Sequence, residues 1–232
     1  MKGKKELIEK LISNSLYSDH YEDPPLFLIS LYQTRFEPSP FPQLLGFSHL
    51  AGYDYYSEKV SLTSADGQYL LRIIKDTVNN QLQAHLLHQE KSSYQYVFIC
   101  AENQRNCYLT DAHGQAKLKD FDLLDLKLKL MPPVAIFEYF PQGVSQTAFL
   151  KPIRCIERFK DSNLQVELFQ QDEEYIFKVK FMNPDSQLKA RKMVLVKEDE
   201  EPLMAIPFKN MALFEVPARF IDSEKVQINI YG

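Results

Sequence analysis

Residues 60–73, VSLTSADGQYLLRI, decide the fold class of this chain. Apolar residues alternate with polar ones on both sides of the dipeptide Asp66-Gly67. A period of two places the apolar side chains on one face of a β-strand, and Asp-Gly is typical of the tight turn in a hairpin. The stretch therefore predicts a β-hairpin with one buried face.

Strands of the same kind are expected further along the chain. The clearest is residues 124–130, where four leucines alternate with Asp and Lys, as in a strand that is buried on one face and solvated on the other. Residues 94–100 and 108–110 are further strand candidates, with polar turn residues between them. Short strands at this spacing are typical of an antiparallel sandwich or barrel.

The second half of the chain resembles the first, which indicates duplication of one β unit of roughly 80 to 90 residues. Chance similarity between amphipathic strands is the alternative. We predict a mainly β fold of two tandem antiparallel β-sandwich domains, over residues 51–151 and 152–232. The matching pairs are Val60 with Val166 and Tyr69 with Tyr175, 106 residues apart; 114–118 with 210–214, 96 apart; and 126–130 with 226–230, 100 apart.

Residues 1–50 are predicted to be a short α-helical segment followed by a linker. The helix is expected over residues 1–36, although the apolar run 25–36 also fits a strand, and Pro38, Pro40 and Pro42 mark the linker. An apolar helix stripe needs either the sandwiches or a partner to pack against. The candidate partner-binding residues are Leu7, Ile8, Leu11, Ile12, Leu26, Phe27, Ile29, Leu31 and Tyr32.

Composition excludes several classes of function from the prediction. The net charge is −4, which gives no general attraction to nucleic acid or to an acidic membrane surface. No window approaches the ~18 to 20 apolar residues needed to cross a bilayer, and the N-terminus does not resemble a secretion signal. With an odd number of cysteines, three, these features predict reduced thiols and a cytoplasmic location.

Motifs for chemistry are sparse, so we predict no enzyme and no catalytic, cofactor-binding or metal-binding residue. The chain has no Gly-rich phosphate loop and no Gly-x-Ser-x-Gly sequence. Cys100 and Cys107 bracket a short loop and are expected to be packed thiols, with a zinc site or redox pair as the alternative. His85 and His88 fall on opposite faces of a strand. Cys155 lies in an apolar context that would make it inert.

The segment Leu109–Leu118, LTDAHGQAKL, resembles the strand–turn–strand signature of carboxypeptidase-regulatory-like and transthyretin-like β-sandwich domains. In that signature Gly114 suits a turn position with positive φ, and Asp111 bonds the backbone of the turn. The opening of the hairpin is similar to segments of bacterial regulatory proteins, some of which are partners of sigma factors. The resemblance implies a sandwich fold and an accessory or binding role, and no catalytic residue.

Three functions remain as hypotheses. The first is a regulatory protein-interaction protein whose N-terminal segment sequesters a partner, such as a sigma factor, with a protease as a second partner that cuts the linker. The second is a carbohydrate- or peptide-binding accessory protein that uses the aromatic groups around Tyr53–Tyr56 and Phe137–Phe140. The third is a hydrolase with a site near His85, His113 or Cys155.

Overall fold

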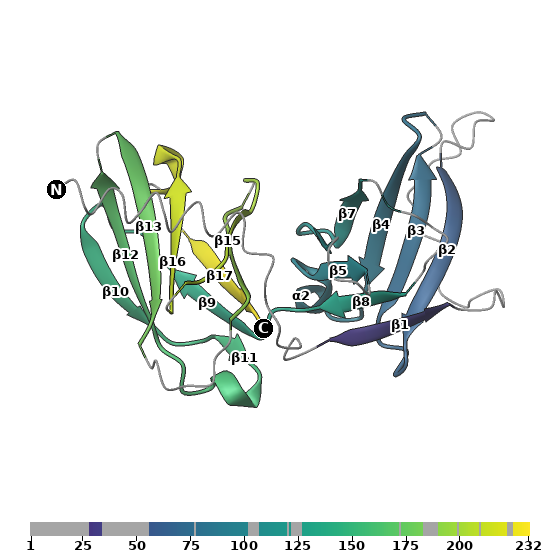
Figure 1. Cartoon of the computed structure of the whole chain (residues 1–232), viewed down its shortest axis with the longest axis horizontal. Helices are drawn as coiled ribbons and strands as arrows, with labels where there is room; N and C mark the ends of the chain where they lie inside the picture. The colour runs from purple at the N-terminus through teal and green to yellow at the C-terminus, as the bar shows by residue number, and fades with distance from the viewer. Residues whose placement is uncertain are drawn as a thin grey trace. The chain divides into compact units, whose positions relative to one another are not determined.

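The computed structural model describes residues 28–33, 56–76, 78–101, 107–119, 121, 127–171, 173–182, 190–198, 200–208, 210–221 and 225–232. Over these residues the chain is mainly β and its sheets are antiparallel, as the sequence predicts. Contacts divide it into two compact units, a first unit at Leu28–Pro132 and a second unit that includes Pro133–Gly232 (Figure 1). The sequence placed this division at residues 151 and 152 instead.

The first unit is one nearly closed sheet. Its described strands form an 8-stranded antiparallel sheet in the order β6-β5-β8-β1-β2-β3-β4-β7, and the end strands β6 and β7 lie against each other. The sequence predicts a sandwich of two sheets here, whereas the hydrogen-bonded ladder runs without a break through all the described strands. The elements are β1 (Ile29–Gln33), β2 (Tyr56–Ser64), β3 (Leu70–Asp76), β4 (Gln81–Leu87), α2 (Lys91–Tyr94), β5 (Phe98–Ala101), β6 (Cys107–Leu109), β7 (Gln115–Leu118) and β8 (Leu128–Met131).

The predicted hairpin joins β2 to β3. Val60 pairs with Ile73 and Leu62 with Leu71, so the alternating apolar residues lie on the buried face of the sheet. Gly67 has a φ of 70°, which suits glycine in the tight turn. The hairpin and its buried face are therefore confirmed.

Strand β1 lies where a helix is expected. It is hydrogen-bonded between β8 and β2 in the first unit, so residues 29–33 form a strand. The alternative for the apolar run 25–36 is therefore the better prediction at these positions. The remainder of residues 1–36 and the proline linker lie outside the described residues.

The second unit contains two sheets that share one core. The 4-stranded sheet has the order β10-β12-β13-β16 and the 5-stranded sheet the order β11-β9-β17-β14-β15 among the described strands, and inward side chains of both belong to one hydrophobic cluster. The elements are β9 (Ala135–Tyr139), β10 (Gln146–Leu150), β11 (Arg154–Cys155), η1 (Glu157–Phe159), β12 (Leu164–Gln171), β13 (Glu174–Phe181), β14 (Lys192–Val196), β15 (Leu203–Ala205), β16 (Met211–Val216), η2 (Ala218–Phe220) and β17 (Val226–Tyr231).

The two units have the same strand order. If β1 to β8 are matched in chain order with β9, β10, β12, β13, β14, β15, β16 and β17, the neighbours β6-β5-β8-β1 become β15-β14-β17-β9. The neighbours β2-β3-β4-β7 become β10-β12-β13-β16 in the same way. In both units the strands at the two ends, β6 and β7 or β15 and β16, lie against each other. This common order supports the duplication.

One backbone hydrogen bond marks the equivalence of the two units. The Leu86 N–H donates to the Gly114 carbonyl at 2.7 Å, and the Phe181 N–H donates to the Asn210 carbonyl at 2.9 Å. Both acceptors have positive φ, 76° and 63°, immediately before equivalent strands β7 and β16. The sequence matches at spacings of 96 and 100 therefore join equivalent strands.

The match at a spacing of 106 joins the wrong strands. It aligns Tyr69 with Tyr175 and so places the β2–β3 hairpin on the β12–β13 hairpin, whereas the strand order matches β12 with β3. Amphipathic hairpins share the same alternation of apolar and polar residues wherever they occur. Similarity of that kind is too weak to fix an alignment.

The units differ at one place. In the first unit β1 pairs with β2, with Leu31 opposite Ser64. In the second unit the equivalent strands β9 and β10 are not paired, and the short strand β11 pairs with β9 instead, with Arg154 opposite Ile136. Strands β9 and β10 thus both precede residue 152, where the sequence predicts the second domain to begin. Strand β10 contacts β9 without pairing with it, and among the described strands it is hydrogen-bonded only to β12.

Candidate interaction surface

The edge strand β10 is an uncharged stretch with one exposed aromatic side chain, Phe149. Its five residues, Gln-Thr-Ala-Phe-Leu, include no charge and no proline. Ala148 pairs with Val166 and Leu150 with Leu164, both fully buried, so the alternate residues Thr147 and Phe149 point away from the core. The Phe149 side chain is 68% exposed. Natural edge strands usually contain Lys, Pro or a bulge that prevents pairing with another strand, and β10 has no such charge or proline.

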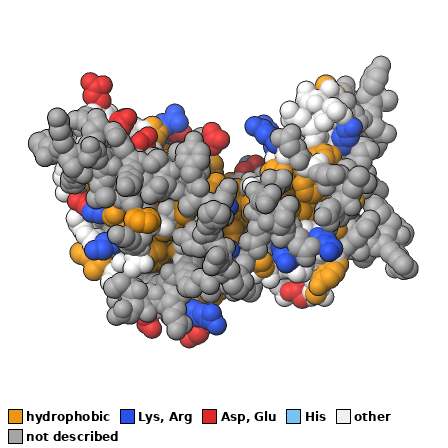
Figure 2. Space-filling view, in the orientation of Figure 1, with side chains coloured by type: hydrophobic (Ala, Val, Ile, Leu, Met, Phe, Trp, Pro, Cys, Tyr) orange, Lys and Arg blue, Asp and Glu red, His pale blue; other side chains and the backbone are white. Residues whose placement is uncertain are grey.

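The outer face of the same sheet contains a second hydrophobic cluster. Ile176 and Leu213 point away from the core of the second unit, yet their side chains are only 2% and 9% exposed. Phe169 and Met211 pack against them. The Lys178 ammonium and the Glu167 carboxylate form an ion pair at 2.8 Å on this face. Hydrophobic side chains also reach the surface as orange patches in Figure 2.

The predicted partner-binding residues fall into two groups. Leu31 is 5% exposed and belongs to the core of the first unit, with Ile29 packed against that core. The Leu31 side chain is therefore part of the core, and the Ile29 side chain is partly buried beside it. Tyr32 is 58% exposed and remains available to a partner. The other candidates, Leu7, Ile8, Leu11, Ile12, Leu26 and Phe27, lie outside the described residues.

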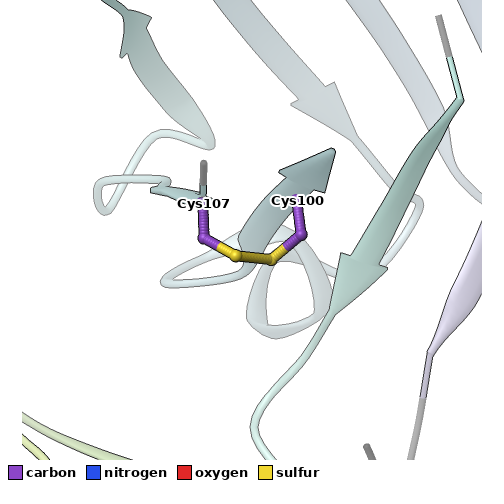
Figure 3. The surroundings of a disulfide bond; sticks show 2 residues. All are labelled: Cys100 and Cys107. Carbon is purple, nitrogen blue, oxygen red and sulfur yellow. A yellow bond between two sulfur atoms is a disulfide. The ribbon is translucent and has the colours of Figure 1, made fainter. Parts of the chain in front are cut away.

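Cys100 and Cys107 form a disulfide, where the sequence predicts two reduced thiols (Figure 3). The two residues lie directly opposite each other on β5 and β6, with a Cα–Cα distance of 4.1 Å. Cross-strand neighbours on an antiparallel pair are close enough for a disulfide. The register of the hairpin brings the two sulfurs together. Cys155 is a free, partly buried thiol.

His85 lies on the outer face of the first unit, within range of the charges of Asp111 and Arg72. Its Nε2 is buried with no hydrogen-bond partner among the described residues. Burial lowers the pKa of His85, while the Asp111 charge acts in the opposite direction and the Arg72 charge in the same direction. The described residues contain no group of three His, Cys, Asp or Glu side chains that would hold a metal ion.

Carboxylates serve as turn residues in the first unit. Asp111 accepts hydrogen bonds from the His113 and Gln115 backbone N–H groups at 2.8 and 2.9 Å. The predicted turn at Gly114, with positive φ and an Asp that bonds the backbone, is therefore confirmed. A hydrogen bond from the Asn79 side chain lowers the pKa of Asp76. A turn of this kind occurs in many β folds, so the family resemblance stays a prediction.

The aromatic groups give little support for a sugar-binding platform. Phe137 and Tyr139 are buried in the core of the second unit, where their neighbours include Phe177, and burial raises the pKa of Tyr139. Only Phe140 of this group is exposed, at 56%. Tyr53 and Tyr55 lie outside the described residues.

Known proteins give no further assignment, because no protein family, curated protein or solved structure matches this chain. In the part of the chain that the structure describes, no helix is both long and apolar enough to span a membrane. The interaction surface therefore rests on the geometry of the second unit alone.

Sequence reasoning missed Thr147 and Phe149. The signal was present as an uncharged run of alternating residues, Gln146–Leu150, that ends at Lys151-Pro152. Pro141 and Pro152 flank the run, and flanking prolines favour a linker over a strand. Its role as an edge depends on the missing β9–β10 pairing, and no local pattern encodes that absence.

Proposed function

We propose that this chain is a non-enzymatic regulatory protein that binds another protein. The observation that supports this most is the apolar outer face of the 4-stranded sheet, where Ile176 and Leu213 are buried on the side away from the core. Apolar side chains on the outer face of a sheet mark a surface that another element covers. A protein segment is the natural occupant because the face combines apolar side chains with an ion pair, Lys178 with Glu167.

The N-terminal segment supplies the second half of this proposal. Its sequence places Leu7, Ile8, Leu11 and Ile12 on one face of a helix, with Glu and Lys on the other. Amphipathic helices of this kind dock in apolar grooves through residues at three- and four-residue spacing. In our proposal the stripe packs on the outer face of the second unit until a partner protein binds the stripe in its place.

The proposed partner is a transcription factor such as a sigma factor, and a protease that cuts the proline linker would release it. This sharper form rests on the resemblance to bacterial regulatory sandwich domains. A carbohydrate- or peptide-binding accessory role is the alternative from a different class. It is less well supported because Phe137 and Tyr139 are core residues.

Truncation tests the proposal. A deletion of residues 1–36 would remove β1 from the first unit, so the informative deletion ends at residue 27. The full chain and the chain lacking residues 1–27 are immobilised in equal amounts and exposed to lysate of the native host. We expect one protein to be enriched on the full chain and lost from the deletion, while circular dichroism shows the same β content for both. Equal capture by the two chains, or no enriched protein, would contradict the proposal.

Matched point variants separate the apolar stripe from the rest of the segment. Leu7→Asp with Leu11→Asp places charge on the stripe, and Glu9→Asp with Ser13→Asp makes changes at the same spacing on the polar face. With the purified partner, we expect the first pair to weaken binding at least tenfold and the second pair to leave it unchanged. Equal effects from both pairs would show that the stripe does not bind the partner.

A further inference from the structure

We propose that the chain forms a symmetric dimer through antiparallel pairing of β10 with β10 of a second copy. The observation behind this is the difference between the two units. Strand β2 has a neighbour on each side, β1 and β3, whereas its equivalent β10 has only β12 among the described strands. The proposal is independent of the proposed function, since neither the N-terminal segment nor its partner takes part.

The repeat specifies what fits the unpaired edge. In the first unit the position beside β2 is filled by an antiparallel strand, with Leu31 opposite Ser64. A two-fold axis between two copies of one strand always makes them antiparallel, because the same patch meets itself. A second copy therefore presents β10 with a neighbour of the direction that β1 gives to β2.

The composition of β10 favours pairing with itself. A two-fold axis at Ala148 places Thr147 opposite Phe149 of the second copy, and Gln146 opposite Leu150. Pairs of an aromatic with a β-branched residue are favourable across antiparallel strands. No like charges meet, because the strand has none. Phe149, which is 68% exposed in one copy, would be covered from the side by the second copy.

Other edges in the described part of the chain are not equivalent to β10. The end strands β6 and β7 lie against each other in the first unit, as do β15 and β16 in the second. Strand β11 is an edge of the 5-stranded sheet, but it has only two residues. Strand β10 has five residues, and although it contacts β9, it is hydrogen-bonded only to β12 among the described strands.

Sedimentation equilibrium of the full chain tests the dimer. The expected interface joins two strands of five residues each, so we expect a weak dimer with a measurable dissociation constant. Phe149→Lys should raise this constant at least tenfold. Val78→Lys, at a position 67% exposed in the first unit, is the matched control and should leave it unchanged. A monomer at all concentrations, or a dimer that Phe149→Lys does not weaken, would overturn the proposal.

Cross-linking tests the register. In a Cys155→Ser background, Thr147→Cys with Phe149→Cys places a thiol opposite a thiol across the two-fold axis, within the Cα–Cα range of a disulfide. Oxidation joins each pair of thiols with loss of two electrons and two protons to an added oxidant such as oxidised glutathione. We expect a covalent dimer from the double variant and none from either single variant, since identical positions lie on a diagonal beyond disulfide reach. Efficient cross-linking of the single variants, or an extended peptide partner that protects β10 in a monomer, would overturn the proposal.

Discussion

Strands β1 and β2 in the first unit are paired, and the equivalent strands β9 and β10 in the second unit are not. The rest of the strand order is the same in both units. In the second unit β11 takes the place beside β9, so that one copy of the repeat is a nearly closed sheet and the other has an unpaired edge. The comparison teaches that two units with the same strand order can differ in a single strand pairing while each keeps its own hydrophobic core.

Substitutions in the core of each unit have the largest expected effect on stability. Leu71 pairs with Leu86, and Leu164 pairs with Phe181, which is equivalent to Leu86. Both leucines are fully buried. If the units are equivalent, Leu71→Ala and Leu164→Ala each lower the free energy of unfolding by about 2–5 kcal/mol, measured by chemical denaturation. A loss below about 1 kcal/mol at either position would mean that the two sites do not correspond.

The turn residues with positive φ give the next largest effect. A Cβ on Gly114 would lie 2.4 Å from the Leu86 carbonyl oxygen, and the φ of 76° is strained for alanine. We expect Gly114→Ala to lower the free energy of unfolding by at least about 2 kcal/mol. Asn210→Gly at the equivalent position should change it by less than about 0.5 kcal/mol, because asparagine and glycine both accept positive φ. Thermal unfolding of both variants measures the difference. A Gly114→Ala variant as stable as the wild type would contradict the equivalence of the two turns.

The disulfide distinguishes the units in a third way. Cys100 and Cys107 occupy the positions of Val194 and Met204, which also face each other across a strand pair. Reduction should lower the free energy of unfolding by about 2 kcal/mol, because the bond closes a short loop. Denaturation with and without dithiothreitol measures this. Cys100→Val with Cys107→Met should make the free energy of unfolding independent of the reductant. A wild-type chain whose free energy of unfolding does not change with dithiothreitol would contradict the prediction.

The smallest expected effect is a dependence of the free energy of unfolding on pH that comes from His85. Burial lowers the pKa of His85 below its ordinary value of 6.5, so below pH 6.5 the unfolded chain binds more protons at this residue than the folded chain does. The stability of the first unit should therefore fall as pH decreases from 6.5. His85→Gln should remove this slope in urea denaturation between about pH 5 and 7. The equivalent position in the second unit is the exposed Lys180. An unchanged slope in His85→Gln would contradict the assignment.

The fold class was accessible from sequence because strand alternation is local. The β2–β3 hairpin follows from the alternation of apolar and polar residues, and the turn at Gly114 follows from the positions of Asp and Gly. The structure confirms both. The alignment of the repeats was not accessible, because amphipathic hairpins resemble one another more than equivalent strands do. Strand β1 was expected as a helix, since a short apolar run fits both structures until its neighbours β2 and β8 are known.

The candidate surface was harder to predict than the fold. The exposure of Phe149 depends on β9 and β10 not pairing, which is a tertiary outcome. The disulfide depends on the register that sets Cys100 opposite Cys107. In both cases the residues are visible in the sequence, but their function depends on a neighbour that is distant or missing. Leu31 shows the reverse case, since a residue expected to bind a partner is part of the core.

Hydrogen exchange of β2 and β10 in one sample tests the central comparison most directly. Leu62, Thr63 and Ser64 lie between β1 and β3, so their amides should exchange slowly at every protein concentration. In Gln146–Leu150, alternate amides should exchange rapidly in dilute solution and become protected as the concentration rises through the dimer range. Amides in β10 that are as protected as those of β2 in dilute solution, or whose exchange does not change with concentration, would contradict the account.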